Sequence, residues 1–245
     1  MNWCSRKAVQ YALAVILVAP SMGLMASAQS LSVLPVNILL GPGEKASTLT
    51  VTNKGTSKTS IQIRAFGWNQ DGDNDVLSPS DLIVVSPPIT SIAPGASQVV
   101  RLILREQPQV REMTYRIILD QIPPPAEPGV VHVVLRLSIP IFAQPFGRVA
   151  PLLRFHGEVK GGQLYLVGSN DGLRHEAIRD VELSTTDGRK LTVASGSSPY
   201  ILAGMTRHWA IDTQGPLPLL NDILQLKAKS DAGAIEQKVP VVAGP

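Results

Sequence analysis

The chain has 245 residues and a formal net charge of only +3, and no run of lysine or arginine appears in it. These features argue against a protein that binds nucleic acid, which would carry a clustered basic patch. The only cysteine is Cys4, so a chain processed beyond that position has no disulfide, no zinc–cysteine site and no cysteine nucleophile.

The first 28 residues have the layout of a secretory signal peptide. Arg6 and Lys7 precede an apolar run, and positions 26–28 read Ala-Ser-Ala, which is typical of a cleavage site. A membrane anchor is the alternative, but the apolar run is short and is interrupted by Pro20. We therefore expect cleavage after Ala28, export to the periplasm, and a mature chain of 217 residues with a formal charge of +1 and no membrane span.

Short β-strands separated by glycine and proline account for the first half of the mature chain. The stretch "SLSVLPVNILLGPGEKASTLTVTNKG" predicts two strands around a Gly-Pro-Gly turn, and "SIQIRAFGWNQDGD" predicts a strand that ends in an acidic glycine turn. Three further short strands are predicted in "DLIVVSPPITSIAPGASQVVRLILR" and one in "MTYRIILDQIPPP". No convincing amphipathic helix interrupts this series.

Residues 130–142, "VVHVVLRLSIPIF", form the most regular predicted strand. Every odd position from 131 to 141 is apolar, whereas the even positions include His132, Arg136 and Ser138. Side chains of a strand alternate between its two faces, so the odd positions form one continuous apolar row. The row has two possible roles: the core of its own domain, or a surface offered to a partner.

The second half of the chain continues in the same style. Strands are predicted in "GGQLYLVGSNDG", "YILAGMTRHWAI" and "ILQLKAKSDAGAIEQKVPVV", and "AIRDVELSTTDGRKLTV" predicts a hairpin about Asp187-Gly188. The mature length suits two β-sandwiches of roughly 100 residues each. We expect an N-terminal domain over residues 29–146 and a C-terminal β-sandwich over 147–245, with the hinge in "AQPFGR".

Motifs for catalysis or metal binding are absent from the sequence. The four histidines are scattered, the His-Glu pairs at 156–158 and 175–176 have no second histidine at ligand spacing, and no Gly-x-Ser-x-Gly elbow or phosphate loop occurs. The acidic stretch at 71–75 lacks the glutamate that completes a calcium loop, so a solvated turn is favoured. We expect no enzyme activity, no cofactor and no metal.

The whole mature chain resembles the periplasmic chaperones of the chaperone–usher pilus pathway. The resemblance rests on "VLPVNILLGPGEKASTLTVTNKG", "IRAFGWNQDGD", "VSPPITSIAPGASQVVRLILR", "YRIILDQIP" and "LRLSIPIFAQP", taken in order, and on "GQLYLVGSNDGLRHEAI" and "YILAGMTRHWAI". The Trp-x-Gln and Ser-Ile-Pro-Ile-Phe details are most similar to the archaic branch. The resemblance implies two immunoglobulin-like domains in an L shape, and an ATP-independent chaperone that lends a strand to unfinished pilus subunits and delivers them to an outer-membrane usher.

The resemblance also implies the site residues. The lent row is expected at Val131, Val133, Leu135 and Leu137, and a basic anchor for the C-terminal carboxylate of the subunit at Arg136 and Arg116. The family's first-strand arginine is missing, since Asn37 occupies its place, and Arg64 and Arg101 are weaker substitutes.

Two alternatives stay open at this point. On composition alone, the apolar row is the domain's own core and a strand arginine is solvated. The alternative function is that of an exported structural or adhesive surface protein built from two sandwiches. A chaperone with a free apolar strand has a further option, because a second copy of the chain can cap that strand when no subunit is bound.

Overall fold

The computed structural model describes residues 31–72, 74–125, 129, 133–194 and 198–244, which form strands and connecting loops. The predicted signal peptide and Val131 lie outside the described residues. The first body contains β1 (Leu31–Leu34), β2 (Ile38–Leu40), β3 (Ala46–Asn53), β4 (Thr59–Asp71), β5 (Asn74–Pro79), β6 (Ile83–Ser86), β7 (Ile89–Ile92), β8 (Ser97–Leu104), β9 (Met113–Ile122) and β10 (Arg136–Ala143). The second contains β11 (Leu153–Lys160), β12 (Gln163–Asn170), β13 (Glu176–Thr185), β14 (Lys190–Val193), β15 (Tyr200–Ile201), β16 (Thr206–Asp212), β17 (Ile223–Ser230) and β18 (Gly233–Ala243).

Two sheets face each other in the first body. One has the order β1-β3-β8-β6, and the other has the order β2-β10-β9-β4-β5, with β7 also paired to β4. The period-two pattern of the sequence explains the packing. Along β8, for example, Val100, Leu102 and Leu104 are buried while the residues between them are exposed or half-buried. Such inward rows from both sheets meet in one hydrophobic core.

The strands of the second body pair in the order β14-β16-β12-β11-β18-β17-β13-β15. An additional pairing connects β14, at one end of this order, with β13, the strand next to the other end. Its core contains Trp209 and the inward rows of β12, β16 and β17. The hairpin predicted about Asp187-Gly188 is formed by β13 and β14, and Gly188 has the positive φ of 88° that this turn requires.

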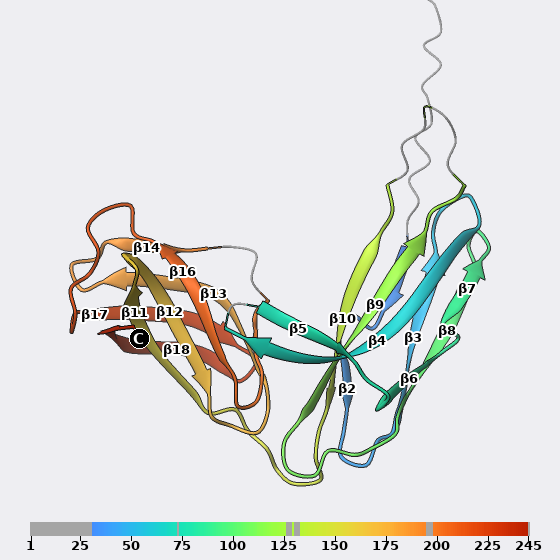
Figure 1. The fold of residues 1–245 in the computed structure, drawn as a ribbon, viewed down its shortest axis with the longest axis horizontal. Helices are drawn as coiled ribbons and strands as arrows, with labels where there is room; N and C mark the ends of the chain where they lie inside the picture. The colour runs from blue at the N-terminus through green and yellow to red at the C-terminus, as the bar shows by residue number, and fades with distance from the viewer. Residues whose placement is uncertain (1–30, 73, 126–128, 130–132, 195–197, 245) are drawn as a thin grey trace, which may run out of the picture.

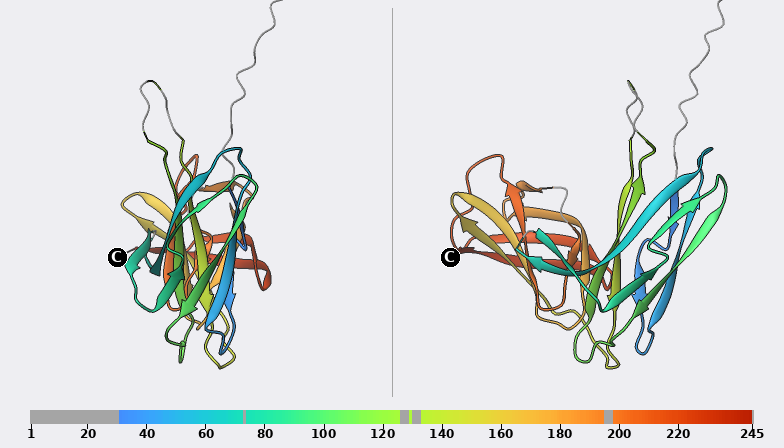
Figure 2. Two further views of the ribbon diagram at one scale, coloured as in Figure 1. Left: turned by 90° about the vertical axis from the view of Figure 1, so that its right-hand side faces the viewer. Right: turned by 45° about the vertical axis from the view of Figure 1, so that its right-hand side comes forward.

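The two bodies are set at an angle to each other, in the L-shaped arrangement of two immunoglobulin-like β-sandwiches that the resemblance implied (Figure 1). The core of the first body extends to Ala143, and that of the second begins at Leu153, so the boundary expected at 146/147 falls in the segment between them. Further views show that the ends of β4 and β5 reach across to the second body (Figure 2). This long hairpin brings polar side chains of the first body to the junction.

Strand β10 has two different edges. Along its whole length it pairs with β9, and on its other side Ile141, Phe142 and Ala143 pair in parallel with β2. Among the described residues, no strand pairs with that other side between Arg136 and Pro140. The backbone of β10 is therefore open for pairing along its first half.

The apolar row of the β10 segment is divided. Ile139 and Ile141 are 3% and 0% exposed and belong to the core, and Leu137 packs against that core while half-buried. Val133 is 88% exposed and Leu135 is 37% exposed. The later part of the row is thus core of its own domain, and the earlier part is exposed.

This division predicts different effects on stability. Replacing Ile141 by alanine leaves a cavity in the core and should lower the free energy of unfolding by about 2–5 kcal/mol. The matched change Val133→Ala removes methyl groups that already face solvent and should alter it by less than about 0.5 kcal/mol. Urea denaturation of the mature protein measures both, and similar losses for the two variants would contradict the division of the row.

Candidate functional site

The first element of the candidate site is the open edge of β10 together with its exposed apolar side chains. Leu135 lies just before the strand, where its carbonyl accepts a hydrogen bond from the backbone N–H of Gln121 at 2.9 Å. Its own backbone N–H donates to the side chain of Gln121 at 3.2 Å. The exposed end of the row is therefore held as an extension of β10, with Val133 and Leu135 uncovered.

A charged cluster occupies the opposite face at the same end of β10. Arg136 and Arg64 both bind the carboxylate of Asp120, Arg64 at 2.7 Å, and Arg136 itself is 70% exposed. Desolvation raises the pKa of Asp120, but the hydrogen bonds from Arg136 and Arg64 outweigh it, so the pKa of this carboxyl lies below its usual value. The charge of Arg136 is thus already paired within the first body.

Arg116 lies elsewhere, at the junction between the two bodies. The register pairs Arg136 with Asp120 and Pro140 with Arg116, so the two arginines are separated by four residues along the sheet, or about 13 Å. The guanidinium carbon of Arg116 stacks 3.7 Å from the ring centroid of Trp68, and the Arg116 side chain is only 11% exposed. The two anchor residues expected from the sequence are therefore not brought together.

The polar partners of Arg116 come from both bodies. Its Nη2 donates to Asp75 on β5 at 3.2 Å and to Ser198 of the second body at 3.4 Å. Burial lowers the pKa of Arg116 by desolvating its charge, and Asp75 opposes this shift. A guanidinium in this setting is poorly solvated and gains strongly from an additional anion.

Asp75 is shared by a second arginine. Arg207 on β16 donates to Asp75 Oδ1 at 2.8 Å, and the Arg207 side chain is 1% exposed. Gln70 donates to the same oxygen at 3.2 Å. Gln70 also bonds the backbone at β15, donating to the carbonyl of Tyr200 and accepting from the N–H of Leu202, which follows the strand. The end of the β4–β5 hairpin is thus fastened to the second body.

An aromatic cluster lies beside these polar groups. Trp68, Phe142 and Leu202 are buried together, and Tyr200 packs against them. His175 of the second body stacks on Phe142 with the ring centroids 3.4 Å apart. Phe142 belongs to β10, so the strand with the open edge is also part of the contact between the bodies.

A buried histidine–carboxylate pair completes the junction. His175 Nδ1 lies 2.6 Å from Glu112 Oε2, and the backbone N–H of His175 donates to the same oxygen at 2.9 Å. The backbone N–H of Glu112 donates to the carbonyl of Leu173. These contacts tie the start of β9, and hence Arg116, to the second body.

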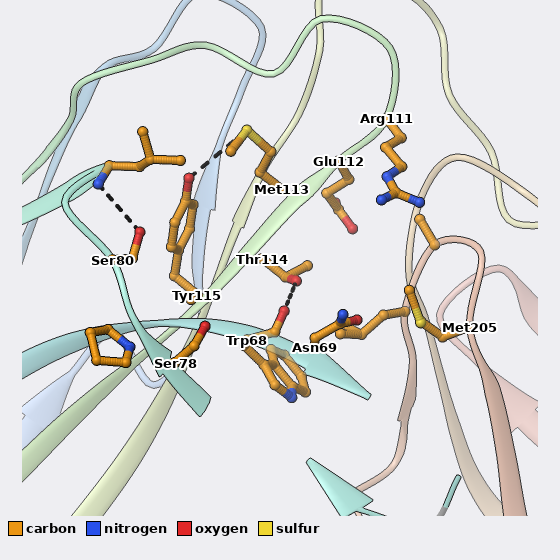
Figure 3. Close-up of a pocket in the computed structure, with 15 residues that line it drawn as sticks. Trp68, Asn69, Ser78, Ser80, Arg111, Glu112, Met113, Thr114, Tyr115 and Met205 are labelled. Atoms are coloured by element: carbon orange, nitrogen blue, oxygen red, sulfur yellow. Dashed lines mark hydrogen bonds between the residues drawn. The ribbon is translucent and has the colours of Figure 1, made fainter. Parts of the chain in front are cut away.

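A hollow of about 280 Å³ opens beside this junction, between β4, the start of β9 and the turn before β16. Figure 3 shows Glu112, Arg111, Asn69 and Met205 around it, with Thr114 hydrogen-bonded to the carbonyl of Trp68. Tyr115, which also lines it, has a pKa raised to about 12 by burial and then by Glu106. Arg116 is not among the lining residues, so the hollow and the cationic site are distinct.

The remaining candidates lie as follows. Asn37 is exposed and immediately precedes β2, one residue before the pairing of Ile38 with Ile141, so it lies level with Pro140 and Arg116 across the sheet. Arg64 belongs to the Asp120 cluster, and Arg101 is exposed on the other sheet. Of the three residues at this level of the sheet, the positively charged one is Arg116 on β9.

Sequence reasoning missed Asp75, Arg207 and Gln70. Asp75 was interpreted as part of a solvated turn, and nothing near Arg207 in the chain marks it as buried. Their contacts join residues about 130 positions apart, and such a juxtaposition leaves no local pattern in the sequence.

The described residues bring together no group of three or more histidine, cysteine or acidic side chains able to hold a metal ion. The same residues contain no helix with the length and apolar character needed to cross a membrane.

Comparisons with known proteins agree on the fold. Residues 30–148 match the model of the "Pili and flagellar-assembly chaperone, PapD N-terminal domain" family. The chain is 29% identical over 140 residues to the chaperone protein PapD of Escherichia coli, a match that covers 54% of this chain and 54% of that relative's length.

Solved structures of such chaperones share the arrangement of both bodies. The chaperone–tip adhesion subunit complex CsuC–CsuE of the archaic Csu pili of Acinetobacter baumannii matches with a TM-score of 0.67 and 24% identity, covering 88% of this chain and all of the matched chain. The Salmonella enterica SafA pilin–SafB chaperone complex matches with a TM-score of 0.58 and 16% identity, over 87% of this chain and 96% of that one. Residues 30–148 are therefore a domain of the "Pili and flagellar-assembly chaperone, PapD N-terminal domain" family.

Proposed function

We propose that this protein is a periplasmic chaperone that binds unfinished pilus subunits by donor-strand complementation and delivers them to an outer-membrane usher. The observation that carries the proposal is the open first half of β10, with Val133 and Leu135 exposed beside it. A sandwich that lacks one strand has an open edge and an exposed core, and such an edge aggregates unless it is covered. Backbone pairing with β10 covers the edge, and the apolar row fills the groove.

The subunit is held in register by a second contact at the junction. From Val133 to Pro140 the chain rises about 23 Å, and Arg116 lies level with Pro140. A subunit strand that lies along β10 with its carboxyl end at the junction places its terminal carboxylate at Arg116. We assign the carboxylate anchor to Arg116 rather than to Arg136, because the Arg116 side chain is largely buried at the junction, whereas that of Arg136 is 70% exposed to water and lies at the other end of the strand.

The mechanism uses no nucleotide and no cofactor. The extension of another subunit enters the subunit groove that β10 occupies and displaces β10. The chaperone is then released, because one set of strand contacts is exchanged for a similar set. In the absence of a subunit, a second copy of this chain is the other proposed occupant of the open edge. Entry into the periplasm relies on the predicted signal peptide.

The anchor assignment predicts unequal effects of two similar substitutions. Arg116→Met keeps the apolar stem over Trp68 but removes the charge, and should reduce recovery of a chaperone–subunit complex at least about tenfold. Arg136→Met removes an exposed, already paired charge and should leave recovery within about twofold of wild type. The measurement is co-purification with a pilus subunit after co-expression in the periplasm.

A modified subunit separates a lost anchor from a damaged fold. A short Gly-Ser extension moves the subunit's carboxylate away from the junction and should weaken binding to the wild-type chaperone as much as Arg116→Met does. Arg116→Met combined with the extended subunit should weaken binding no more than either change alone, since both changes remove the same contact. Full recovery with Arg116→Met, or loss with Arg136→Met alone, would show that the anchor is misassigned.

The lent row predicts a dependence on side-chain face. Leu135→Asp places a charge in the subunit groove and should abolish the complex. Val134→Asp, one position earlier and 47% exposed, faces the other way and should preserve it. Both side chains are exposed in the free protein, so both variants should keep the wild-type thermal unfolding midpoint. Equal loss of the complex in the two variants would exclude a role for the row.

A further inference from the structure

The cluster of Arg116, Asp75 and Arg207 at the junction holds more positive than negative charge. The guanidinium groups of Arg116 and Arg207 are both largely removed from solvent, and they bind the same carboxylate, that of Asp75. Arg207 Nε is buried and has no hydrogen-bond partner among the described residues. One carboxylate between two arginines leaves a formal surplus of one positive charge, and a buried surplus is costly unless an anion offsets it.

Arg207 competes with Arg116 for this carboxylate. Arg207 donates to Oδ1 at 2.8 Å, whereas Arg116 reaches Oδ2 at 3.2 Å. The shorter contact comes from the arginine that is almost fully enclosed, and Gln70 donates to the same Oδ1. The negative charge of Asp75 is therefore directed mainly to the buried side of the junction, and Arg116 on the open side is only partly neutralised.

We propose that Arg207 is a positioning residue for the client carboxylate, a role that rests on the proposed anchor function of Arg116. By holding Asp75, Arg207 prevents this internal carboxylate from occupying Arg116 in place of the client's. Without the charge of Arg207, Asp75 is free to pair fully with Arg116, and the client carboxylate must then displace it. Arg207 acts through Asp75 and lies behind it, so it needs no contact with the client.

The arrangement links binding to the docking of the two domains. Arg116 and Asp75 belong to the first body and Arg207 to the second, so the surplus charge exists only while the domains are in contact. A bound carboxylate offsets the surplus that docking creates. Binding at Arg116 should therefore also strengthen the domain contact, as reciprocity between linked equilibria requires.

The test uses the mature full-length protein and two synthetic peptides. Both are N-acetylated chains of alternating valine and threonine, one with a free C-terminal carboxylate and the other with a C-terminal amide. Isothermal titration calorimetry should show that wild type prefers the free carboxylate by about tenfold or more. Arg116→Met should abolish this preference. A wild-type protein that does not distinguish the peptides, or binds neither, would overturn the proposed anchor itself.

Variants at Arg207 then test the positioning role separately. Arg207→Met should weaken binding of the free-carboxylate peptide by about tenfold and leave the amide peptide unchanged, as expected for coupled charges. Arg207→Lys retains the charge and should retain most of the preference. The double variant Asp75→Asn, Arg207→Met restores the surplus charge on Arg116 and should recover the preference, which a purely structural role of Arg207 does not predict.

Two results would overturn the positioning role while the anchor stands. One is an unchanged carboxylate preference in Arg207→Met although Arg116→Met has lost it. The other is that Arg207→Met weakens the binding of both peptides equally and that the double variant does not restore it. That result would mean that Arg207 only holds the domains together. Thermal unfolding of each variant, with and without the free-carboxylate peptide, gives an independent measure of the link to domain docking.

Discussion

The structure depends on how charge is compensated where the two sandwiches meet. Arg116, Asp75 and Arg207 lie in a setting that excludes most water, next to Trp68, and only one of the three is negative. Ion pairs of this kind cost desolvation and are maintained only by well-placed partners. Gln70, which binds Asp75 and the backbone of β15, supplies that placement. The domain arrangement and the cationic site are therefore products of the same contacts.

Strand β10 connects this junction to the open edge. Its last residues pair with β2 and place Phe142 under His175, whereas its first residues pair only with β9 among the strands described. A single strand thus contributes to the core of its own domain, to the contact between domains and to an unpaired edge. The inward residues Ile139 and Ile141 keep it rigid, so that the exposed Val133 and Leu135 are presented from a fixed support.

Much of the fold follows from local sequence patterns. Period-two alternation predicted most of the strands, although not β5 or β11, and the Asp187-Gly188 turn predicted its hairpin, because both signals reside in neighbouring residues. The candidate site was harder to predict from the sequence. Arg136 and Arg116 are alike in sequence, each an arginine within a strand, but one meets Asp120 at the end of the sheet and the other enters the junction. Only the strand register and the position of the second domain distinguish these two arginines. The contact between Asp75 and Arg207 cannot be predicted from local spacing or from composition.

The distance between the two parts of the site gives the fold its functional consequence. A strand that pairs along β10 can slip by two residues and still match the alternation of apolar side chains. Such a slip moves its end by about 6.6 Å, which, in the proposed complex, takes the terminal carboxylate out of contact with Arg116. In that complex the apolar row alone supplies affinity with little register, and the arginine alone supplies register with little buried area. Because Arg116 is fixed by contacts that require both domains, the register of a bound strand depends on a domain that the strand itself need not touch.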